Sequence, residues 1–439
     1  MTVELTPLGV ACNLSCTYCY QHPMRDAGNM GNKKPYDLEK MFAALTEENA
    51  KFSVFGGEPL LVPLDDLERI WEFGFVRWKE NGIQTNGVLI TPAHIGAFMK
   101  WNVHVGFSLD GPDELNDSRW AGTLERTRES TEKSHANLRA CIAAGVRTSV
   151  IVTLYRGNAS AEKLPRLKEW IRELDRIDTK GIRIHTLEVD HPVVREKMQL
   201  KQEEVIVAIG ELIKLERELS KLRLDVTSDV RRLLRVDDDQ VTCTWNPCDP
   251  YTTSAVHGVD GQGNRTNCGR TNKDGIPRLK GPRVGFERQL ALYRTPQADG
   301  GCQGCRFFIM CKGQCPGTAI DGDWRNRSQD CPTWMFLFET LEREMLENGE
   351  LPLSLSPDRL RLESAMLGLW ETGQTMSLKS ALARINAGQT LVSAFIAGNV
   401  DHGDAPHGDE HGDHWDDAPS ELPHGDAPHG DHTDAEAGT

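Results

Sequence analysis

The sequence lacks several features that would place the protein in other classes. No run of about 18 apolar residues occurs, which excludes a transmembrane helix. The start, MTVELTPLGV, has neither the basic region nor the apolar stretch of a secretory signal peptide. No basic stripe stands out, which speaks against nucleic-acid binding. We therefore expect a cytoplasmic protein, without nucleic-acid or membrane partners, in a compartment that keeps thiols reduced.

Lysine and arginine are missing from residues 401–439, which contain nine Asp and three Glu. This segment carries −12 of the formal net charge of −15, so the first 400 residues carry about −3. It repeats His-Gly-Asp, as in HGDAPHGDEHGDHWDD, and has low complexity. Such a composition has too little apolar surface to form a core and predicts disorder.

The chain contains 12 cysteines, which in a reducing compartment favour metal or redox chemistry over disulfides. Three of them lie close together in ACNLSCTYCY. We call Cys12, Cys16 and Cys19 the cysteine trio. Zinc takes four protein ligands, or three and water. Iron–sulfur clusters are usually held by four thiolates, so three would leave one iron open to a small molecule.

Apolar strands alternate with helical stretches through residue 190. This pattern predicts an α/β fold, a partial (β/α)6 barrel similar to a TIM barrel, with its site at the carboxyl ends of the strands. We expect strands at 2–8, 51–56, 82–88, 102–109, 146–154 and 181–188. We expect helices near 37–49, 64–78, 92–99, 130–144 and 159–173.

The remaining chain divides by composition. A long charged helix, about 200–222, is expected to bridge to residues 240–332, which are loop-rich and contain eight cysteines. That stretch has too little apolar periodicity to fold on a core alone, so we expect metal to hold it together. Further helices are expected at 333–348, from Ser356-Pro357 onward and at 378–387. The predicted domains are 1–195, 196–239, 240–348, 349–400 and the disordered tail 401–439.

The stretch Phe55-Gly56-Gly57-Glu58-Pro59 follows the second expected strand. Glycines there allow the backbone to approach a ligand closely. Together with the cysteine trio after the first strand, this stretch resembles the radical S-adenosylmethionine (SAM) superfamily. The resemblance implies a four-iron four-sulfur cluster on the trio, with its open iron chelated by the amino and carboxylate groups of SAM.

Polar residues after the later strands extend the resemblance, although the family's usual pattern has a histidine where this chain has Asn116. By resemblance, Glu58 would lie near the SAM amino group, and Asp110 near the ribose. Ser108 and Arg119 would hold the carboxylate. Loop capping is the ordinary alternative for these side chains. The candidate SAM-binding residues are Gly56, Gly57, Glu58, Gln84, Asn86, Ser108, Asp110, Arg119 and Asn158.

The second cysteine group, with Cys302-x2-Cys305-x5-Cys311-x3-Cys315 at its centre, resembles a SPASM domain, which binds two auxiliary clusters. The resemblance implies a first quartet, Cys243, Cys248, Cys268 and Cys315. It implies a second quartet, Cys302, Cys305, Cys311 and Cys331. Three 4Fe-4S clusters and SAM would then be the cofactors, with zinc as the alternative. Cys141 is left over, on the apolar side of a helix, and is expected in the core.

The resemblance also implies the chemistry. A flavodoxin- or ferredoxin-type reductant supplies one electron, and SAM is cleaved to methionine and a 5′-deoxyadenosyl radical that removes hydrogen from a peptide substrate. The auxiliary clusters accept an electron, so the net reaction is an oxidation. The protein orients the groups and excludes water and oxygen. A rival of another class is a non-catalytic iron–sulfur carrier or metal-binding protein.

Two substrate classes stay open. One is formylglycine formation in a sulfatase, but that branch has aspartate after the cysteine aligned with Cys268, where this chain has Gly269. The other is a crosslink in a peptide, cyclophane-like on aromatic-x-Asp. Because the first expected strand starts near residue 2, we expect no leader-binding domain before it; a separate protein or residues 350–400 would then bind a leader. The tail, with Trp415-Asp416-Asp417, is a candidate fused substrate, an inert acidic tail or a metal-binding segment.

One barrel residue is a candidate for acid–base chemistry. Arg183 and His185 alternate with Ile182 and Ile184 on the sixth expected strand. The isoleucines are expected to face the outer helices, so His185 faces the interior and could transfer a proton or contact substrate. A structural histidine is the alternative.

Overall fold

One twisted sheet organises the N-terminal half of the chain. In this computed structural model, the structure describes residues 2–22, 36–188, 191–253, 257–271, 283–389 and 391. The sheet has the order β6-β5-β4-β3-β2-β1-β7-β8, and all neighbours are parallel except β7 and β8. Its strands are β1 (Thr2–Thr6), β2 (Lys51–Val54), β3 (Asn81–Thr85), β4 (Val103–Ser108), β5 (Thr148–Leu154), β6 (Ile182–Thr186), β7 (His257–Asp260) and β8 (Arg265–Thr266). The six predicted strands and the open barrel are confirmed; β7 and β8 were not expected.

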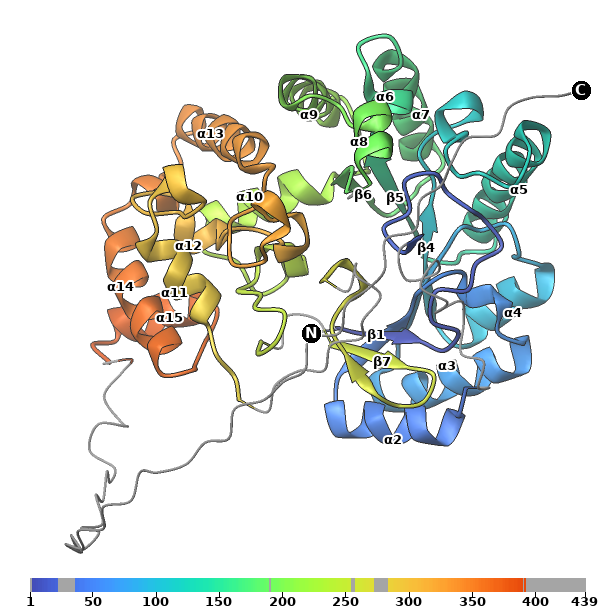
Figure 1. Cartoon of the computed structure of the whole chain (residues 1–439), viewed down its shortest axis with the longest axis horizontal. Coiled ribbons are helices and arrows are strands. Elements are labelled where there is room, and N and C mark those ends of the chain that lie inside the picture. The colour runs from blue at the N-terminus through green and yellow to red at the C-terminus, as the bar shows by residue number, and fades with distance from the viewer. Residues whose placement is uncertain are drawn as a thin grey trace, which may run out of the picture. The chain divides into compact units, whose positions relative to one another are not determined.

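Helices between the strands cover one face of this sheet (Figure 1). Polar caps start several of them: the Asp37 carboxylate accepts from the Lys40 N–H, and the Thr123 hydroxyl from the Arg126 N–H. These helices are α2 (Leu38–Glu48), α3 (Leu64–Trp78), α4 (Pro92–Lys100), α5 (Leu124–Ala143), α6 (Arg156–Ala159) and α7 (Leu164–Arg176). Five of them agree with the predicted helices, except that α5 begins earlier and α7 later; α6 was not expected.

The two faces of the sheet differ in polarity. On β5, Val150 and Val152 are fully buried against the helices, while Ser149 and Thr153 on the other face are half-buried. Cys141 lies in the same core, fully buried on α5 as predicted, and burial raises its pKa to about 12. The outer face therefore holds the hydrophobic core, and the inner face carries polar side chains.

The predicted helix at 200–222 is wrong in its extent. The structure has α8 (Pro192–Met198) and α9 (Gln202–Glu216), followed by a turn and α10 (Asp225–Leu234). Asp175 explains the turn, because its carboxylate accepts from the N–H groups of Ser220, Lys221 and Leu222 at 2.7–3.0 Å. Backbone groups bound this way are not available to continue the helix.

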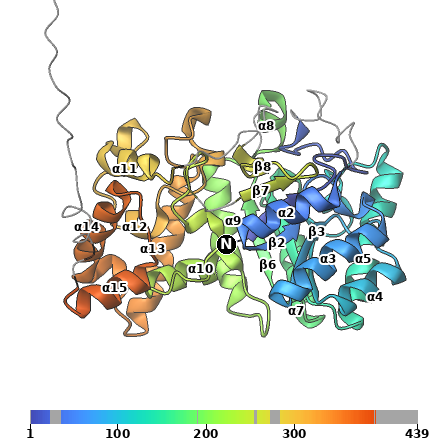
Figure 2. The ribbon, with the colours of Figure 1, turned by 90° about the horizontal axis from the view of Figure 1, so that it is seen from below.

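The cysteine-rich part is built from short helices and one hairpin. The β7–β8 hairpin pairs with β1, so residues 257–266 extend the barrel sheet. The helices lie together on the other side of α10 from the sheet in both views (Figures 1 and 2). They are α11 (Glu287–Arg294), α12 (Phe308–Cys311), α13 (Cys331–Glu347), α14 (Asp358–Glu371) and α15 (Leu378–Asn386).

Residues 1–392 form one compact unit, so the predicted boundaries at 195, 239 and 348 stay predictions. The disordered tail predicted for 401–439 lies outside the described residues. Within the described part of the chain, no helix is long and apolar enough to cross a membrane.

Candidate active site

The cysteine trio lies on the loop that follows β1, at the carboxyl end of the parallel sheet. Each of the three residues is partly exposed. Burial is the largest cause that raises the pKa of Cys16 to about 12; the charge of Arg119 lowers it, and the charges of Cys19 and Cys12 add to the rise. A positive centre is needed to hold thiolates at such a site, as a metal cluster provides.

Backbone hydrogen bonds fix this loop against the segment that follows β4. The Ser15 N–H donates to the Trp120 carbonyl at 2.7 Å, and the Thr17 N–H to the Ser118 carbonyl at 2.8 Å. From β3, the Asn86 amide donates to the Asn13 side chain at 2.7 Å. The loop geometry is therefore set by residues far away in the sequence.

The two glycines of the FGGEP turn pack against the cysteine loop itself. Gly57 has φ +45°, and a Cβ there would lie 1.9 Å from the Ala11 carbonyl oxygen. Gly56 has φ +81°, and its Cβ would lie 2.6 Å from the Gly9 carbonyl oxygen. Both positions require glycine for backbone conformation and for space.

Glu58 is fully buried and ties the turn to the end of β3. Its Oε1 accepts from the Leu60 N–H at 3.0 Å and from the Thr85 hydroxyl at 2.7 Å, and its Oε2 accepts from the Asn86 N–H at 2.8 Å. Burial raises the pKa of Glu58, and these three hydrogen bonds lower it in part. The carboxylate positions the loop; its predicted contact with a SAM amino group stays a prediction.

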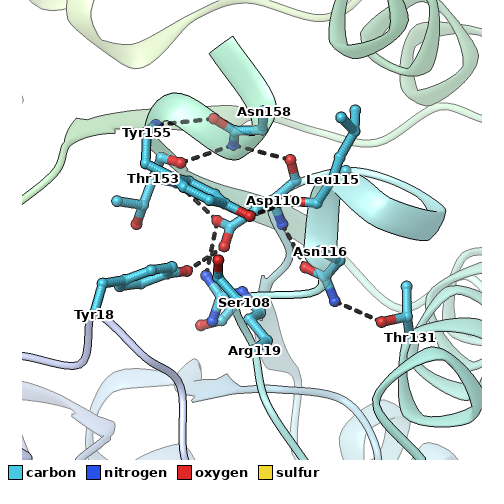
Figure 3. A network of polar contacts seen from close by, with 12 residues as sticks. Tyr18, Ser108, Asp110, Leu115, Asn116, Arg119, Thr131, Thr153, Tyr155 and Asn158 are labelled. Carbon is cyan, nitrogen blue, oxygen red and sulfur yellow. Dashed lines mark hydrogen bonds and ion pairs between the residues drawn. The ribbon is translucent and has the colours of Figure 1, made fainter. Parts of the chain in front are cut away.

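Asp110 is the centre of a buried network that joins three loops (Figure 3). Its Oδ1 accepts from Arg119 Nη2 at 3.0 Å and from the Thr153 N–H at 2.9 Å, and its Oδ2 accepts from the Tyr18 hydroxyl. Tyr18 lies between Cys16 and Cys19. The network therefore connects the cysteine trio directly to the ends of β4 and β5, a role of Tyr18 that the sequence did not indicate.

Asn158 and Asn116 complete this network (Figure 3). The Asn158 amide donates to the carbonyls of Asp110 and Thr153 at 3.0 and 2.8 Å, and the Asn116 side chain accepts from the Asp110 N–H at 2.9 Å. Asn116 thus fills the position where the family has histidine. The predicted place of Asn158 on the adenosine side stays a prediction.

Arg119 offers a donor to this site. Its Nε is buried without a hydrogen-bond partner among the described residues, although Nη2 is paired with Asp110. Ser108 accepts from Gln84 Nε2 at 2.8 Å. A Cβ at Gly106 would lie 2.2 Å from Gln84 Oε1, so the glycine makes room for that side chain. An unused guanidinium N–H beside the trio fits an anionic group such as a carboxylate.

Cys268, a member of the first quartet, follows β8. Burial raises the pKa of Cys268 well above its usual range, and the charges of Glu4, Cys315, Cys248 and Cys243 add to the effect. All three predicted partners are therefore among the groups whose charges act on this thiol, and their shared cluster stays a prediction.

The second quartet lines one cavity, together with aromatic side chains and Met335. Two donors of this lining, Trp334 Nε1 and Arg327 Nε, are buried without partners among the described residues. Across those residues, no three ligating side chains converge on a single ion. Four thiols spread around a cavity, with unused N–H donors toward it, fit a cluster whose sulfides accept hydrogen bonds.

His185 lies on the inner face of the barrel, as predicted, because Ile182 and Ile184 are buried on the other face. Burial lowers its pKa well below the usual range, and the charges of Arg270 and Arg183 lower it further. The imidazole is therefore neutral at pH 7, and the lowered pKa makes it a weaker base than a free histidine.

Glu4 and Arg270 are two inner residues that the sequence did not single out. Glu4 accepts from the Gly269 N–H, and burial raises its pKa to about 7. Arg270 pairs with Glu188 at 2.5 Å. The position of Glu4 between Val3 and Leu5 in a strand was the available signal, since a charged residue there must face away from the core.

Comparison with known proteins agrees with this geometry. Residues 6–171 match the Radical SAM superfamily. The chain contains a radical SAM domain. The chain is 32% identical over 128 residues to a cysteine-type anaerobic sulfatase-maturating enzyme of Clostridium perfringens, and 31% identical over 129 residues to a serine-type anaerobic sulfatase-maturating enzyme of Bacteroides thetaiotaomicron. These matches cover 27% and 26% of this chain and 35% and 30% of the relatives, so the chain matches about a third of their length.

The structural likeness extends beyond the radical SAM domain. The structure titled native anSMEcpe with bound AdoMet and Cp18Cys peptide covers 79% of this chain and 98% of its own, with a TM-score of 0.58 and 19% identity. The structure of Streptococcus suis SuiB covers 75% of this chain and 76% of its own, with a TM-score of 0.50 and 13% identity. The shared fold therefore covers about twice as much of the chain as residues 6–171.

Proposed function

We propose that this chain is a radical SAM/SPASM maturase that oxidises a peptide or protein side chain. The proposal rests on one observation: the cysteine trio follows β1 of a matched radical SAM domain, beside the unpaired Nε of Arg119. Two cysteine quartets farther along the chain support an oxidative reaction. The sulfatase-maturating relatives and the peptide named in the anSMEcpe structure support a peptide or protein substrate.

The residues that would hold the cofactors follow from the site. The trio would bind the SAM cluster, and the first and second quartets would bind two auxiliary clusters. When bound, the cluster and SAM supply a 5′-deoxyadenosyl radical that removes hydrogen. Arg119 Nε would hold the SAM carboxylate with Ser108, while Glu58 and Asp110 keep the loops in place. Gly56, Gly57, Gln84, Asn86 and Asn158 would complete the SAM site.

Oxidation of the substrate also releases a proton, and the two candidates to accept it are the inner residues His185 and Glu4. His185 is neutral at pH 7, and Glu4 has its pKa near neutrality. Glu4 is bound to the N–H of Gly269, the position where the sulfatase branch has aspartate. A base is expected to affect product formation more than SAM cleavage, so His185→Gln or Glu4→Gln should release 5′-deoxyadenosine with less modified peptide.

Two reactions fit the site, and they differ in what happens to the side chain. Formylglycine formation is supported by the sulfatase-maturating relatives. Formation of a crosslink is supported by the absence of a carboxylate at Gly269 and by the aromatic-x-Asp stretch at Trp415. A cysteine converted to formylglycine loses its sulfur, whereas a crosslink removes only two hydrogens.

One experiment tests the function. The protein is reconstituted anaerobically with iron and sulfide and given SAM, a reductant and a cysteine-containing sulfatase peptide. We expect 5′-deoxyadenosine from the wild type and from Cys141→Ala, and none from Cys12→Ala. Mass spectrometry of the peptide and of the protein's own tail then identifies the reaction. If the wild type forms no more 5′-deoxyadenosine than the Cys12→Ala control, the proposed activity is refuted, and the protein is better described as a non-catalytic iron–sulfur carrier.

A further inference from the structure

Arg288 is a buried cation that the proposed function does not use. It is the second residue of α11 and is 1% exposed. Its five N–H groups are all directed at backbone carbonyls, and among the described residues no carboxylate pairs with it. The acceptors and distances are Trp324 2.6 Å, Cys248 3.3 Å, Lys312 3.5 Å, Gly313 3.3 Å and Asn326 3.0 Å.

This guanidinium lies between the two cysteine quartets. It binds the carbonyl of Cys248, a member of the first quartet. It also binds the carbonyls of Lys312 and Gly313, which lie between Cys311 of the second quartet and Cys315 of the first. Thiols of both quartets act electrostatically on it.

A buried charge without a counter-ion is costly, and carbonyl dipoles compensate it only in part. Arginine remains protonated even when buried, so the charge persists. A four-iron four-sulfur cluster with four thiolates is anionic, and one-electron reduction makes it more so. A fixed cation between two such clusters therefore stabilises their reduced forms more than their oxidised forms.

We propose that Arg288 is a counter-charge shared by the two auxiliary clusters and that it raises the reduction potential of both. The inference rests on the proposed function. A substrate radical that is oxidised to product gives up one electron and one proton. A higher potential at the auxiliary clusters favours acceptance of that electron. Arg288 is thus a positioning residue for electron transfer and does not touch substrate.

The test uses the full chain with Cys12→Ala, Cys16→Ala and Cys19→Ala, so that only auxiliary clusters are titrated. Potentials are measured by redox titration followed by electron paramagnetic resonance. In this parent, Arg288→Gln should shift the reduction equilibrium of both clusters toward the oxidised form at least about tenfold, which is about 59 mV for one electron. Arg288→Lys keeps the charge and should shift it far less.

The control is Arg325→Gln, which removes an arginine 68% exposed and paired with Asp323. It should leave both potentials unchanged. Equal potentials for Arg288→Gln and the parent, or equal shifts for Arg288→Gln and Arg288→Lys, would overturn the proposal. So would a shift of only one cluster.

Iron and sulfide analysis separates this inference from the proposed function. A parent without auxiliary iron would refute the auxiliary clusters themselves. If Arg288→Lys takes up iron and Arg288→Gln does not, with equal circular dichroism of the apoproteins, the clusters need the charge and the proposal stands. If both variants lose iron alike, Arg288 only supports the fold and the proposal fails.

Discussion

The Asp110 network predicts a large difference between two ion pairs that lie close together in the sequence. Asp110 and Arg119 pair at 3.0 Å with side chains 0% and 10% exposed. Asp117 and Arg128 pair at the same distance with side chains 28% and 47% exposed. Asp110→Asn keeps the shape and most hydrogen bonds but leaves the Arg119 charge uncompensated in a buried site.

Breaking a buried pair costs about 3–5 kcal/mol, whereas an exposed pair contributes about 0–1 kcal/mol. We therefore expect Asp110→Asn to lower the free energy of unfolding of the apoprotein by about 3 kcal/mol, and Asp117→Asn by less than about 1 kcal/mol. Urea denaturation followed by circular dichroism, under reducing and anaerobic conditions, measures both changes. Because Tyr18 links the pair to the trio, Asp110→Asn should also retain less iron in the SAM cluster.

A double-mutant cycle separates charge from packing. Arg119→Met removes the uncompensated charge, so the double variant with Asp110→Asn should be more stable than the sum of the single changes by about 1–3 kcal/mol. Strict additivity would refute the argument. Equal costs for Asp110→Asn and Asp117→Asn would refute it as well.

Three further changes test other parts of the structure. Gly57→Ala brings a Cβ to 1.9 Å from the Ala11 carbonyl oxygen, so it should displace the cysteine loop and lower iron retention by the trio. The iron content is measured in a variant that lacks the cysteines of both quartets. Gly96→Ala is the control, because its Cβ meets no atom within 4 Å. Cys302→Ala should remove one cluster's iron, and the buried Cys141→Ala should remove none. Asp175→Asn should cost about 1–3 kcal/mol at pH 7, because a backbone N–H loses its charged acceptor. Burial raises the pKa of Asp175, but the hydrogen bonds from Leu222, Lys221 and Ser220 outweigh burial and hold the pKa below its usual range. The stability difference between the wild type and Asp175→Asn should therefore persist above about pH 4 and shrink at lower pH. Denaturation at a series of pH values measures it. A difference that grew with falling pH would contradict the assignment.

Local patterns predicted most of the sheet. The alternation of apolar and polar residues along a strand can be read from residues two positions apart. On β6, Ile182 and Ile184 therefore identify the buried face from the sequence alone. The spacing of the cysteines in the trio is also a local pattern. It gave the resemblance to the radical SAM superfamily, which residues 6–171 match. The β7–β8 hairpin could not be predicted in this way, because Val3 pairs with His257, more than 250 residues away.

Residues whose role depends on packing were also missed. Arg288 reads as a surface arginine in a polar stretch, yet five carbonyls from three separate segments surround it. The end of α9 depends on Asp175, which belongs to α7. Glu58 and Asp110 were expected near SAM from motif position alone, and the structure adds the contacts by which they hold the loops.

The two faces of the sheet have different roles, and this difference fits the proposed function. Valines and isoleucines on the outer face carry the hydrophobic core, so stability does not depend on filling the inner face. The inner face keeps small or polar residues, such as Ser53, Gly106 and Ser149, and remains partly accessible on β2 and β5. A Cβ at Gly106 would collide with Gln84 at 2.2 Å, so even one added carbon disturbs this face. The inner face thereby has few bulky side chains, and titratable residues such as Glu4 and His185 lie there without weakening the core.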